Sequence, residues 1–230
     1  MTTVKKLGVL GATGPTGQEL VKQTLAAGHR VVVVVHSPEK FPDEIRSSEN
    51  LQCVQGNIFS SEELTKAFDG VSAVLSCLGA HGIGPKLPFM DPMTFYEDSC
   101  RAAVDAMKAL SIRRFVGITS WGTKKEPGNP AFIECVVRPF MIARHLDSMA
   151  RMEDLLESEK KDIDFTVVRP PALGKAPSEG KEILVAENKQ VVGDASIITA
   201  MPRADVAKFM LECLHSDQYV GKMVAVHVQT

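Results

Sequence analysis

Three glycines near the amino end constrain the fold of this chain more than any other feature. Gly11, Gly14 and Gly17 are spaced three residues apart, directly after the short apolar run 7–10. Residues 18–27 then alternate polar and apolar side chains at helical spacing, and Gly28 is a helix stop signal. Residues 30–35 contain five consecutive valines, which is typical of a strand buried on both faces. The order strand, glycine turn, helix and strand predicts a βαβ unit.

The same alternation continues along the chain. Ser60 and Glu63 predict a capping box at the start of a helix that ends near residue 68. Alternation of this kind predicts a parallel sheet with helices on both faces, so we expect an α/β fold with one Rossmann-like, doubly wound domain over residues 1–230. The other predicted strands are 51–54, 71–75, 115–118, 165–168 and 223–228, and the other predicted helices are 93–110, a helix within 140–160, and 203–214.

Three long connections interrupt the pattern: 79–92, 122–139 and 171–199. Each is rich in glycine and proline, and each follows the carboxyl end of a predicted strand. In open α/β sheets ligands bind at that edge, and long loops in compact domains are usually functional. We expect these segments to be substrate loops.

Charge and cysteine content exclude several classes of protein. The formal net charge is −2, so the chain offers no basic field for a nucleic-acid backbone. The cysteines are dispersed without a Cys-x-x-Cys pair, which predicts reduced thiols and no metal site. The apolar run near the amino end is short and broken by glycines, so we expect neither a secretory signal nor a membrane span, and a cytoplasmic location. The five cysteines are Cys53, Cys77, Cys100, Cys135 and Cys213.

The glycine spacing also carries chemistry. Gly11 permits a tight exit from the strand, Gly14 lets the backbone approach a diphosphate, and Gly17 allows the helix to pack on the strand. Free N–H groups at the start of the helix attract the anion. A tight turn that binds nothing is the alternative, but the strand before the turn and the helix after it favour dinucleotide binding.

The end of the second predicted strand indicates which dinucleotide. A carboxylate at this point would bind the ribose 2′-hydroxyl of NAD. The sequence instead has His36, Ser37 and Lys40, which offer donors and positive charge to a 2′-phosphate, although Glu39 weakens the field. We expect NADP(H) as the cofactor; the alternative is a solvated loop.

The sequence resembles the atypical short-chain dehydrogenase/reductases, and more narrowly the NADPH-dependent flavin reductases and biliverdin reductases of the beta type. Segments in the expected order over nearly the whole chain carry the resemblance. They are GATGPTG (11–17), VVHSPEKFP (34–42), QGNIFS (55–60), VLSCLG (74–79), GITSWG (117–122), VVRPPALG (167–174) and PRADVAKFMLECL (202–214).

The resemblance implies roles for further positions around the cofactor. Those at the phosphates are Thr13, Pro15 and Thr16; those at the adenine are Asn57 and Ile58; those beside the cofactor after the fourth strand are Cys77, Leu78 and Gly79; and those at the nicotinamide are Thr119, Ser120, Pro170 and Pro171.

The chain also departs from the pattern of these families. The short-chain dehydrogenase acid is a tyrosine with a lysine four residues later, whereas Tyr96 and Tyr219 are followed at that spacing by Cys100 and Met223. The flavin and biliverdin reductases tend to have a histidine after the two prolines, where this chain has Ala172. These departures leave the substrate open.

Ser120 is the candidate catalytic residue, as a hydroxyl that donates to or positions the reacting atoms. A serine that only ties down the turn is an equal alternative. Trp121 could stack on a flat acceptor and His145 could donate a proton, but both have structural interpretations as well. Glu153 and the acidic and basic residues after it are interpreted as a charged helix surface.

These observations predict an NADPH-dependent reductase that transfers hydride to a flat conjugated acceptor, namely a flavin, a biliverdin-like tetrapyrrole or a quinone. The alternative is a non-catalytic NADP(H)-binding redox sensor, which the missing tyrosine–lysine pair keeps open. We expect a monomer with a small-molecule substrate and no nucleic-acid or membrane partner.

Overall fold

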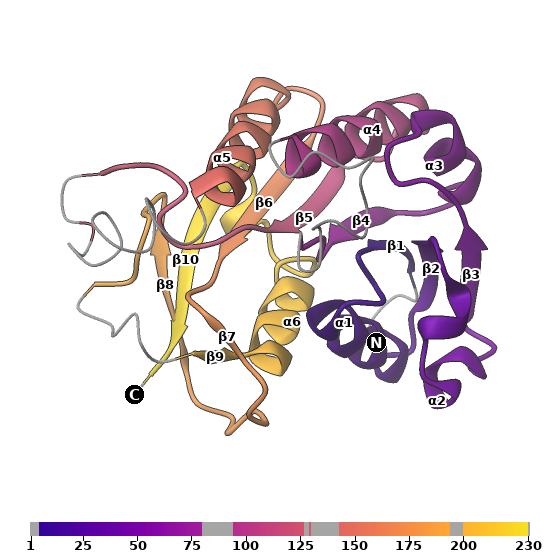
Figure 1. The fold of residues 1–230 in the computed structure, drawn as a ribbon, viewed down its shortest axis with the longest axis horizontal. Coiled ribbons are helices and arrows are strands. Elements are labelled where there is room, and N and C mark those ends of the chain that lie inside the picture. Colours follow the sequence, from indigo (N-terminus) through magenta and orange to yellow (C-terminus); the bar gives the residue numbers. More distant parts are fainter. Residues whose placement is uncertain (1–4, 80–93, 127–128, 130–142, 194–199, 230) are drawn as a thin grey trace.

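The computed structural model describes residues 5–79, 94–126, 129, 143–193 and 200–229, and its centre is an eight-stranded sheet (Figure 1). All neighbouring strands run parallel except β8, which pairs antiparallel with β10. In spatial order the strands are β3 (Leu51–Gln55), β2 (Arg30–Val35), β1 (Lys6–Leu10), β4 (Ala73–Ser76), β5 (Arg114–Ile118), β6 (Asp164–Arg169), β10 (Lys222–Val228) and β8 (Ile183–Glu187).

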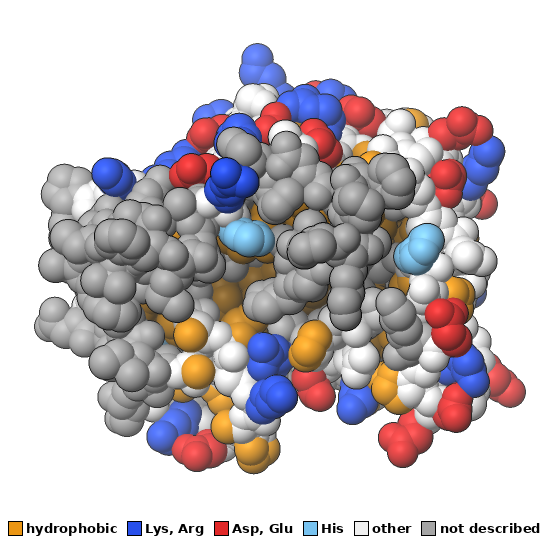
Figure 2. Space-filling view, in the orientation of Figure 1, with side chains coloured by type: hydrophobic (Ala, Val, Ile, Leu, Met, Phe, Trp, Pro, Cys, Tyr) orange, Lys and Arg blue, Asp and Glu red, His pale blue; other side chains and the backbone are white. Residues whose placement is uncertain are grey.

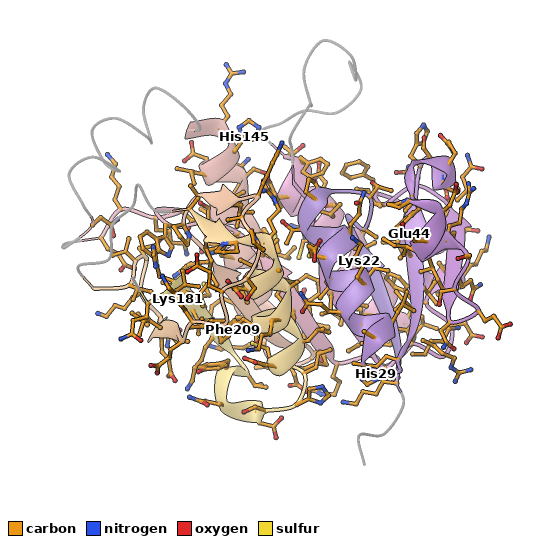
Figure 3. The ribbon with its side chains drawn as sticks, turned by 90° about the horizontal axis from the view of Figure 1, so that it is seen from below. Lys22, His29, Glu44, His145, Lys181 and Phe209 are labelled. Atoms are coloured by element: carbon orange, nitrogen blue, oxygen red, sulfur yellow. The ribbon has the colours of Figure 1, made fainter. Side chains whose placement is uncertain are left out.

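Helices cover both faces of this sheet. On one face lie α1 (Pro15–Ala26) and α6 (Arg203–Glu212), and on the other lie α3 (Ser61–Ala67), α4 (Phe95–Ala109) and α5 (Ala143–Ser158), as Figure 1 shows. The two helices of the first face are side by side in Figure 3, where Lys22 marks α1 and Phe209 marks α6. The Gln23 amide also donates from α1 to the Ala204 carbonyl of α6, at 2.9 Å. The predicted Rossmann-like fold is confirmed.

The valines of β2 explain the two-faced sheet. Val31, Val33 and Val35 pack into the core beneath α1 and α6. Val32 and Val34 pack into the core beneath α3 and α4. Successive side chains of a strand point to opposite faces, so a strand between two helical layers needs apolar residues at every position.

Two expectations about the sheet were wrong. The segment 171–199 contains β8 and the short strand β7 (Leu173–Gly174), which pairs with β9 (Met201–Pro202). The sheet is also not wholly parallel. No helix lies between β6 and β8, so the chain turns back at the carboxyl edge and β8 runs antiparallel beside β10. The sequence of β8, ILVAE, is short and mostly half-buried, so its alternation of apolar and polar residues is weak.

A short helix, α2 (Asp43–Arg46), and a single turn of 3-10 helix at Pro38–Lys40 were not predicted.

Two helices begin differently from the expectation. α1 starts at Pro15 rather than at residue 18, because proline suits the first helical position, where no N–H is needed. The capping box of α3 is only half formed: the Ser60 Oγ accepts the Glu63 N–H at 3.3 Å. The Glu63 carboxylate accepts the N–H of Asn57, at 2.8 Å, and not that of Ser60.

Because of His29, which lies at the amino edge of the sheet, we expect the stability of the protein to depend on pH. Its buried Nδ1 accepts the Lys5 N–H at 3.2 Å, and its ring stacks on His215 with centroids 6.0 Å apart. Burial first, and then the charges of His215 and Lys5, lower the pKa of His29 from 6.5. Below pH 6.5 the unfolded chain takes up a proton that the folded protein does not. Stability is therefore complete above that pH and falls as the pH drops, by up to about 1.4 kcal/mol per pH unit.

Urea unfolding between pH 5 and pH 7.5 measures this slope. The variant His29→Gln should lose the part of the slope that this one proton contributes, whereas His36→Gln, at an exposed histidine, should keep it. Equal slopes in the wild type and His29→Gln would contradict the assignment.

Candidate functional site

The candidate site lies at the carboxyl edge of the sheet, between β1 and β4. Leu10, the last residue of β1, pairs with Ser76 of β4 on one side and with Val34 of β2 on the other. The chain leaves β1 for a helix on one face and leaves β4 for a helix on the opposite face, so the strand order reverses here. In open α/β sheets the crevice outside such a reversal is the ligand site.

Two glycines of the turn after β1 are required by the fold itself. Gly11 has φ +73°, and a Cβ there would lie 2.6 Å from the carbonyl of Cys77. A Cβ on Gly17 would lie 2.2 Å from the carbonyl oxygen of Gly11. Only glycine therefore lets the turn lie against the end of β4 and lets α1 pack back on the turn.

Gly14 differs from these two because the protein leaves space beside it. A Cβ there would meet a single neighbouring atom within 4 Å among the described residues, the Gly11 oxygen at 3.3 Å, and its φ of −72° suits any residue. The first bond within α1 runs from the Gln18 N–H to the Gly14 carbonyl, at 2.9 Å. The N–H groups of Thr16 and Gly17 precede that bond, and the first turn of α1 holds no acidic residue. An open glycine beside helix-start amides fits the approach of a diphosphate.

The rest of the predicted phosphate turn is held in shape by one side chain. The Gln18 amide donates to the Thr13 carbonyl at 3.0 Å, which fixes the turn against the first helical turn. Pro15 occupies the first helical position, and the Thr16 side chain is buried beneath it.

At the end of β2 the structure places His36 on the surface and Ser37 half-buried, with no carboxylate at either position. The Gln55 amide donates to the His36 carbonyl at 3.3 Å and so joins the ends of β2 and β3. Lys40 closes the 3-10 turn that follows, but its side chain lies outside the described part of the chain.

Asn57 and Ile58 follow β3 at the same edge. The Asn57 Oδ1 accepts the N–H of Phe59 at 3.0 Å, and Ile58 packs against the core beneath α3. The Asn57 side chain therefore shapes the turn, and the exposed backbone of this turn borders the ends of β2 and β3.

Cys77, Leu78 and Gly79 follow β4. The Cys77 N–H donates to the Leu10 carbonyl at 2.9 Å, while its Sγ lies 3.7 Å from the Met210 Sδ on α6. Burial raises the pKa of the Cys77 thiol to about 12, so the thiol is not a nucleophile at neutral pH. These residues therefore offer backbone to the crevice, and Gly79 is the last described residue before the gap.

Pairing between β5 and β6 continues beyond the strands and brings the predicted nicotinamide residues together. The Thr119 N–H donates to the Val168 carbonyl at 2.9 Å, and the Trp121 N–H donates to the Pro170 carbonyl at 3.0 Å. Ser120, which lies between these two bonds, is half-buried, and Pro170 and Pro171 are buried. The Thr119 hydroxyl donates to the Glu153 carboxylate at 2.8 Å, so only the Thr119 backbone is available to a cofactor.

Beneath these residues lies an ion pair that sequence reasoning missed. Glu153 was interpreted as part of a charged helix surface, but its side chain is fully buried, and it binds the Arg169 guanidinium with two bonds of 2.9 and 2.7 Å. One signal was available. Glu153 lies with Met152 and Leu156 on the buried face of α5, and Arg169 ends a strand that is buried from Phe165 onward.

Neither tyrosine is placed to act as an acid at this edge. Tyr96 is buried in the core, with its ring edge-on to Phe95 at a centroid distance of 5.2 Å. Tyr219 precedes β10 and so lies at the amino edge of the sheet, with its hydroxyl pKa raised by burial. His145 is half-buried in the first turn of α5, and Figure 3 labels it.

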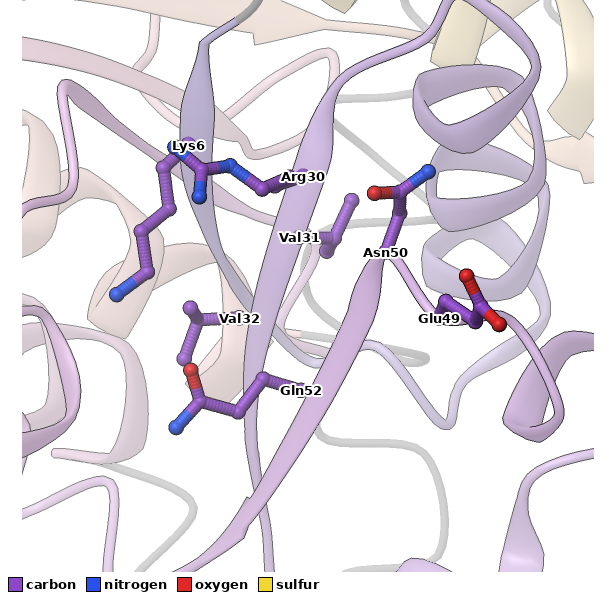
Figure 4. A pocket seen from close by; sticks show the side chains of 7 residues that line it. All are labelled: Lys6, Arg30, Val31, Val32, Glu49, Asn50 and Gln52. Atoms are coloured by element: carbon purple, nitrogen blue, oxygen red, sulfur yellow. The ribbon is translucent and has the colours of Figure 1, made fainter.

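Figure 4 shows a pocket at the opposite, amino edge of β1, β2 and β3. The pocket is lined by Lys6, Arg30, Val31, Val32, Glu49, Asn50 and Gln52. Figure 2 shows positive and negative side chains interspersed around one face.

Within the described ranges, no cluster of three or more His, Cys, Asp or Glu side chains could hold a metal. No helix in these ranges has the length and apolar character to cross a bilayer. Residues 80–92, 127–128, 130–139 and 194–199 of the predicted substrate loops lie outside those ranges.

The chain is similar in sequence to two proteins of Arabidopsis thaliana. The chain is 26% identical over 227 residues to an uncharacterized chloroplastic protein of Arabidopsis thaliana, covering 96% of this chain and 76% of the relative. It is 23% identical over 234 residues to the chloroplastic divinyl chlorophyllide a 8-vinyl-reductase of the same plant, covering 95% of this chain and 52% of that enzyme.

Among solved structures, a short-chain dehydrogenase/reductase of the wide type from Veillonella parvula, in complex with NADP, superimposes with a TM-score of 0.78 at 18% identity. That match covers 97% of this chain and 94% of the other. The family model described as NAD(P)H-binding matches residues 11–217, from the first glycine of the turn to beyond α6. The chain belongs to this NAD(P)H-binding family of oxidoreductases.

Proposed function

We propose that the protein is an NADPH-dependent reductase that transfers hydride to a flat conjugated acceptor: a flavin, a biliverdin-like tetrapyrrole or a quinone. The observation that carries the proposal is the open space beside Gly14, next to the helix-start amides of Thr16 and Gly17. Among the described residues, a Cβ there would meet only the Gly11 oxygen, at 3.3 Å, whereas a diphosphate seated on those amides would occupy the space itself.

The preference for NADPH rests on the end of β2. His36 and Ser37 occupy the position where a carboxylate would hold the 2′-hydroxyl of NAD, and Lys40 follows within the same turn. A 2′-phosphate gains donors and positive charge at this position. The similarity to a structure solved in complex with NADP supports the same choice of cofactor.

When bound, the cofactor would supply the hydride, and this chain would bind and orient it. The backbone of Cys77–Gly79 and of Thr119 would border it, and the buried Pro170 and Pro171 would line its nicotinamide end. Ser120 is half-buried between them, where its hydroxyl would position the acceptor.

The acceptor class follows from what the site lacks. With Tyr96 in the core and Tyr219 at the amino edge, no tyrosine acid stands at the described crevice. A conjugated acceptor suits such a site, because its electron-rich product can take a proton from water. The relative that reduces divinyl chlorophyllide, a tetrapyrrole, supports this class.

The same absence favours one second candidate, a regulatory protein that binds NADP(H) without turnover. Ala172 is exposed directly after the two prolines and offers no proton donor there.

For either candidate we propose a monomer that acts in the cytoplasm. The two Arabidopsis relatives are chloroplastic, so microscopy of a tagged protein is the direct test of location.

One experiment separates the two candidates. The purified protein is mixed with NADPH and, in turn, flavin mononucleotide, biliverdin and a soluble quinone, and the absorbance of the reduced nicotinamide is followed. We expect steady oxidation by at least one acceptor, and none with the variant Gly14→Val. Tight NADPH binding without oxidation by any acceptor would favour the regulatory protein, and the absence of binding would contradict both.

A further inference from the structure

The buried carboxylate of Glu153 is fully satisfied by its neighbours. Its Oε1 accepts the Thr119 hydroxyl at 2.8 Å and the Arg169 Nε at 2.9 Å. Its Oε2 accepts the Thr123 hydroxyl at 2.9 Å and the Arg169 Nη2 at 2.7 Å. Glu153 and Thr123 are 0% exposed, and Arg169 is 3% exposed.

Further hydrogen bonds join this group to the segment after β8. The Arg169 Nη1 donates to the Lys189 carbonyl at 3.0 Å. The Gln190 Oε1 accepts the Lys124 N–H at 3.2 Å and lies 3.0 Å from the Thr123 hydroxyl oxygen. One ion pair thus connects α5, the end of β5, the end of β6 and the segment after β8.

The connected segments are those that would border the nicotinamide. Thr119 and Thr123 flank Ser120 and Trp121, and Arg169 directly precedes Pro170 and Pro171. Because each threonine hydroxyl is bonded to the carboxylate, the direction of the backbone between them is fixed by Glu153. The two sides of the predicted nicotinamide site are therefore held by the same carboxylate.

The energy of such a pair argues against a role in stability alone. Removing two charges from water costs several kcal/mol for each ion, and a well-packed apolar pair of similar volume is often as stable or more stable. A bidentate pair with two further hydroxyl donors instead fixes geometry. Sites that transfer hydride depend on such precision.

We propose that Glu153 and Arg169 are positioning residues for hydride transfer, holding the backbone that carries Ser120 and the prolines at the nicotinamide. This inference rests on the proposed reductase function. The pair touches neither cofactor nor acceptor; it acts through the Thr119–Thr123 segment and the end of β6.

The chain contains an internal reporter for this proposal. Trp121 is its only tryptophan, is buried within the fixed segment, and donates its backbone N–H to the Pro170 carbonyl. Tryptophan emission overlaps the absorption of reduced nicotinamide, so bound NADPH quenches it by energy transfer, with an efficiency that depends on their separation and orientation. This signal reports the placement of the nicotinamide without requiring turnover.

The test compares two double variants, each of which replaces one glutamate of α5 and its basic partner. Glu153→Leu with Arg169→Met replaces the buried pair by apolar side chains, and Glu157→Leu with Lys160→Met removes an exposed pair whose atoms are 2.6 Å apart. We expect both variants to melt within about 5 °C of the wild type. NADPH affinity should hardly change in either, because the diphosphate turn is separate from both pairs. Only the buried-pair variant should show altered quenching of Trp121 and a kcat lowered by roughly tenfold to a hundredfold.

Unchanged quenching and unchanged kcat in the folded buried-pair variant would overturn the proposal, since a purely structural pair would leave both intact. If that variant does not fold, Thr123→Val removes a single hydroxyl contact to the carboxylate and should show the same changes at smaller size; wild-type behaviour of Thr123→Val would overturn it equally. Wild-type protein that binds NADPH but reduces no acceptor would count against the proposed reductase, while the quenching still tests the positioning.

Discussion

Replacing Gly14 by valine is expected to raise the Kd for NADPH by at least about a hundredfold while the protein stays folded. The added side chain would fill the open space beside the helix-start amides and keep the diphosphate from them. Two lost charge-assisted hydrogen bonds are worth roughly 3–6 kcal/mol, and each step of about 1.4 kcal/mol is tenfold in Kd. Calorimetric titration with NADPH and a thermal melt of the free protein measure the two effects.

Gly17→Ala is the matched control within the same turn. Its Cβ would lie 2.2 Å from the Gly11 oxygen, so this smaller substitution should lower the stability of the free protein by roughly 1–3 kcal/mol, as overpacking does. Gly14→Val, whose Cβ would lie 3.3 Å from the same oxygen, should lower the melting temperature less than Gly17→Ala. A Gly14→Val variant that binds NADPH normally would show that the crevice is not the diphosphate site.

Replacing His36 by aspartate together with Lys40 by glutamate is expected to reverse the cofactor preference. The two acids would repel the 2′-phosphate of NADPH, and aspartate at the end of β2 could accept a bond from the 2′-hydroxyl of NADH. We expect the Kd for NADPH to rise by about a hundredfold, and that for NADH to stay within about threefold of its starting value. Titration with both nucleotides at the same ionic strength measures the ratio.

The control for net charge is Lys22→Glu together with Lys208→Glu, at two exposed lysines on α1 and α6. This change makes the protein more acidic by a similar amount without altering the end of β2, and both affinities should fall only slightly. Equal losses for NADPH and NADH in the variant at His36 and Lys40 would contradict the NADP(H) assignment.

The parts of the fold that follow local rules could be predicted from the sequence. The valines of β2 and the glycine spacing predicted the first βαβ unit. Gly17 is explained by backbone contacts within its own turn, and Gly11 by its positive φ and its contact with the end of β4. β8 could not be predicted with equal force, because its pairing partner β10 lies far along the chain and the direction of the pairing depends on tertiary packing.

The candidate site shows the same division. The residues near the turn could be located from the strand ends, since the carboxyl ends of parallel strands meet at one edge. The burial of Glu153 could not, because a charge becomes buried only where partners exist, and its partners come from residues 119, 123 and 169. Helical periodicity shows which face of a helix a residue occupies, but not which residues of the sheet lie against that face.

The contact between α1 and α6 has a consequence for how the molecule is assembled. Leu20 and Val21 of α1 share their core with Val206 and Met210 of α6, although the two helices lie far apart in the sequence. During synthesis, the inner side of α1 therefore stays partly uncovered until α6 has also been made. The glycine turn that precedes α1 is held firmly only once this long-range contact has formed.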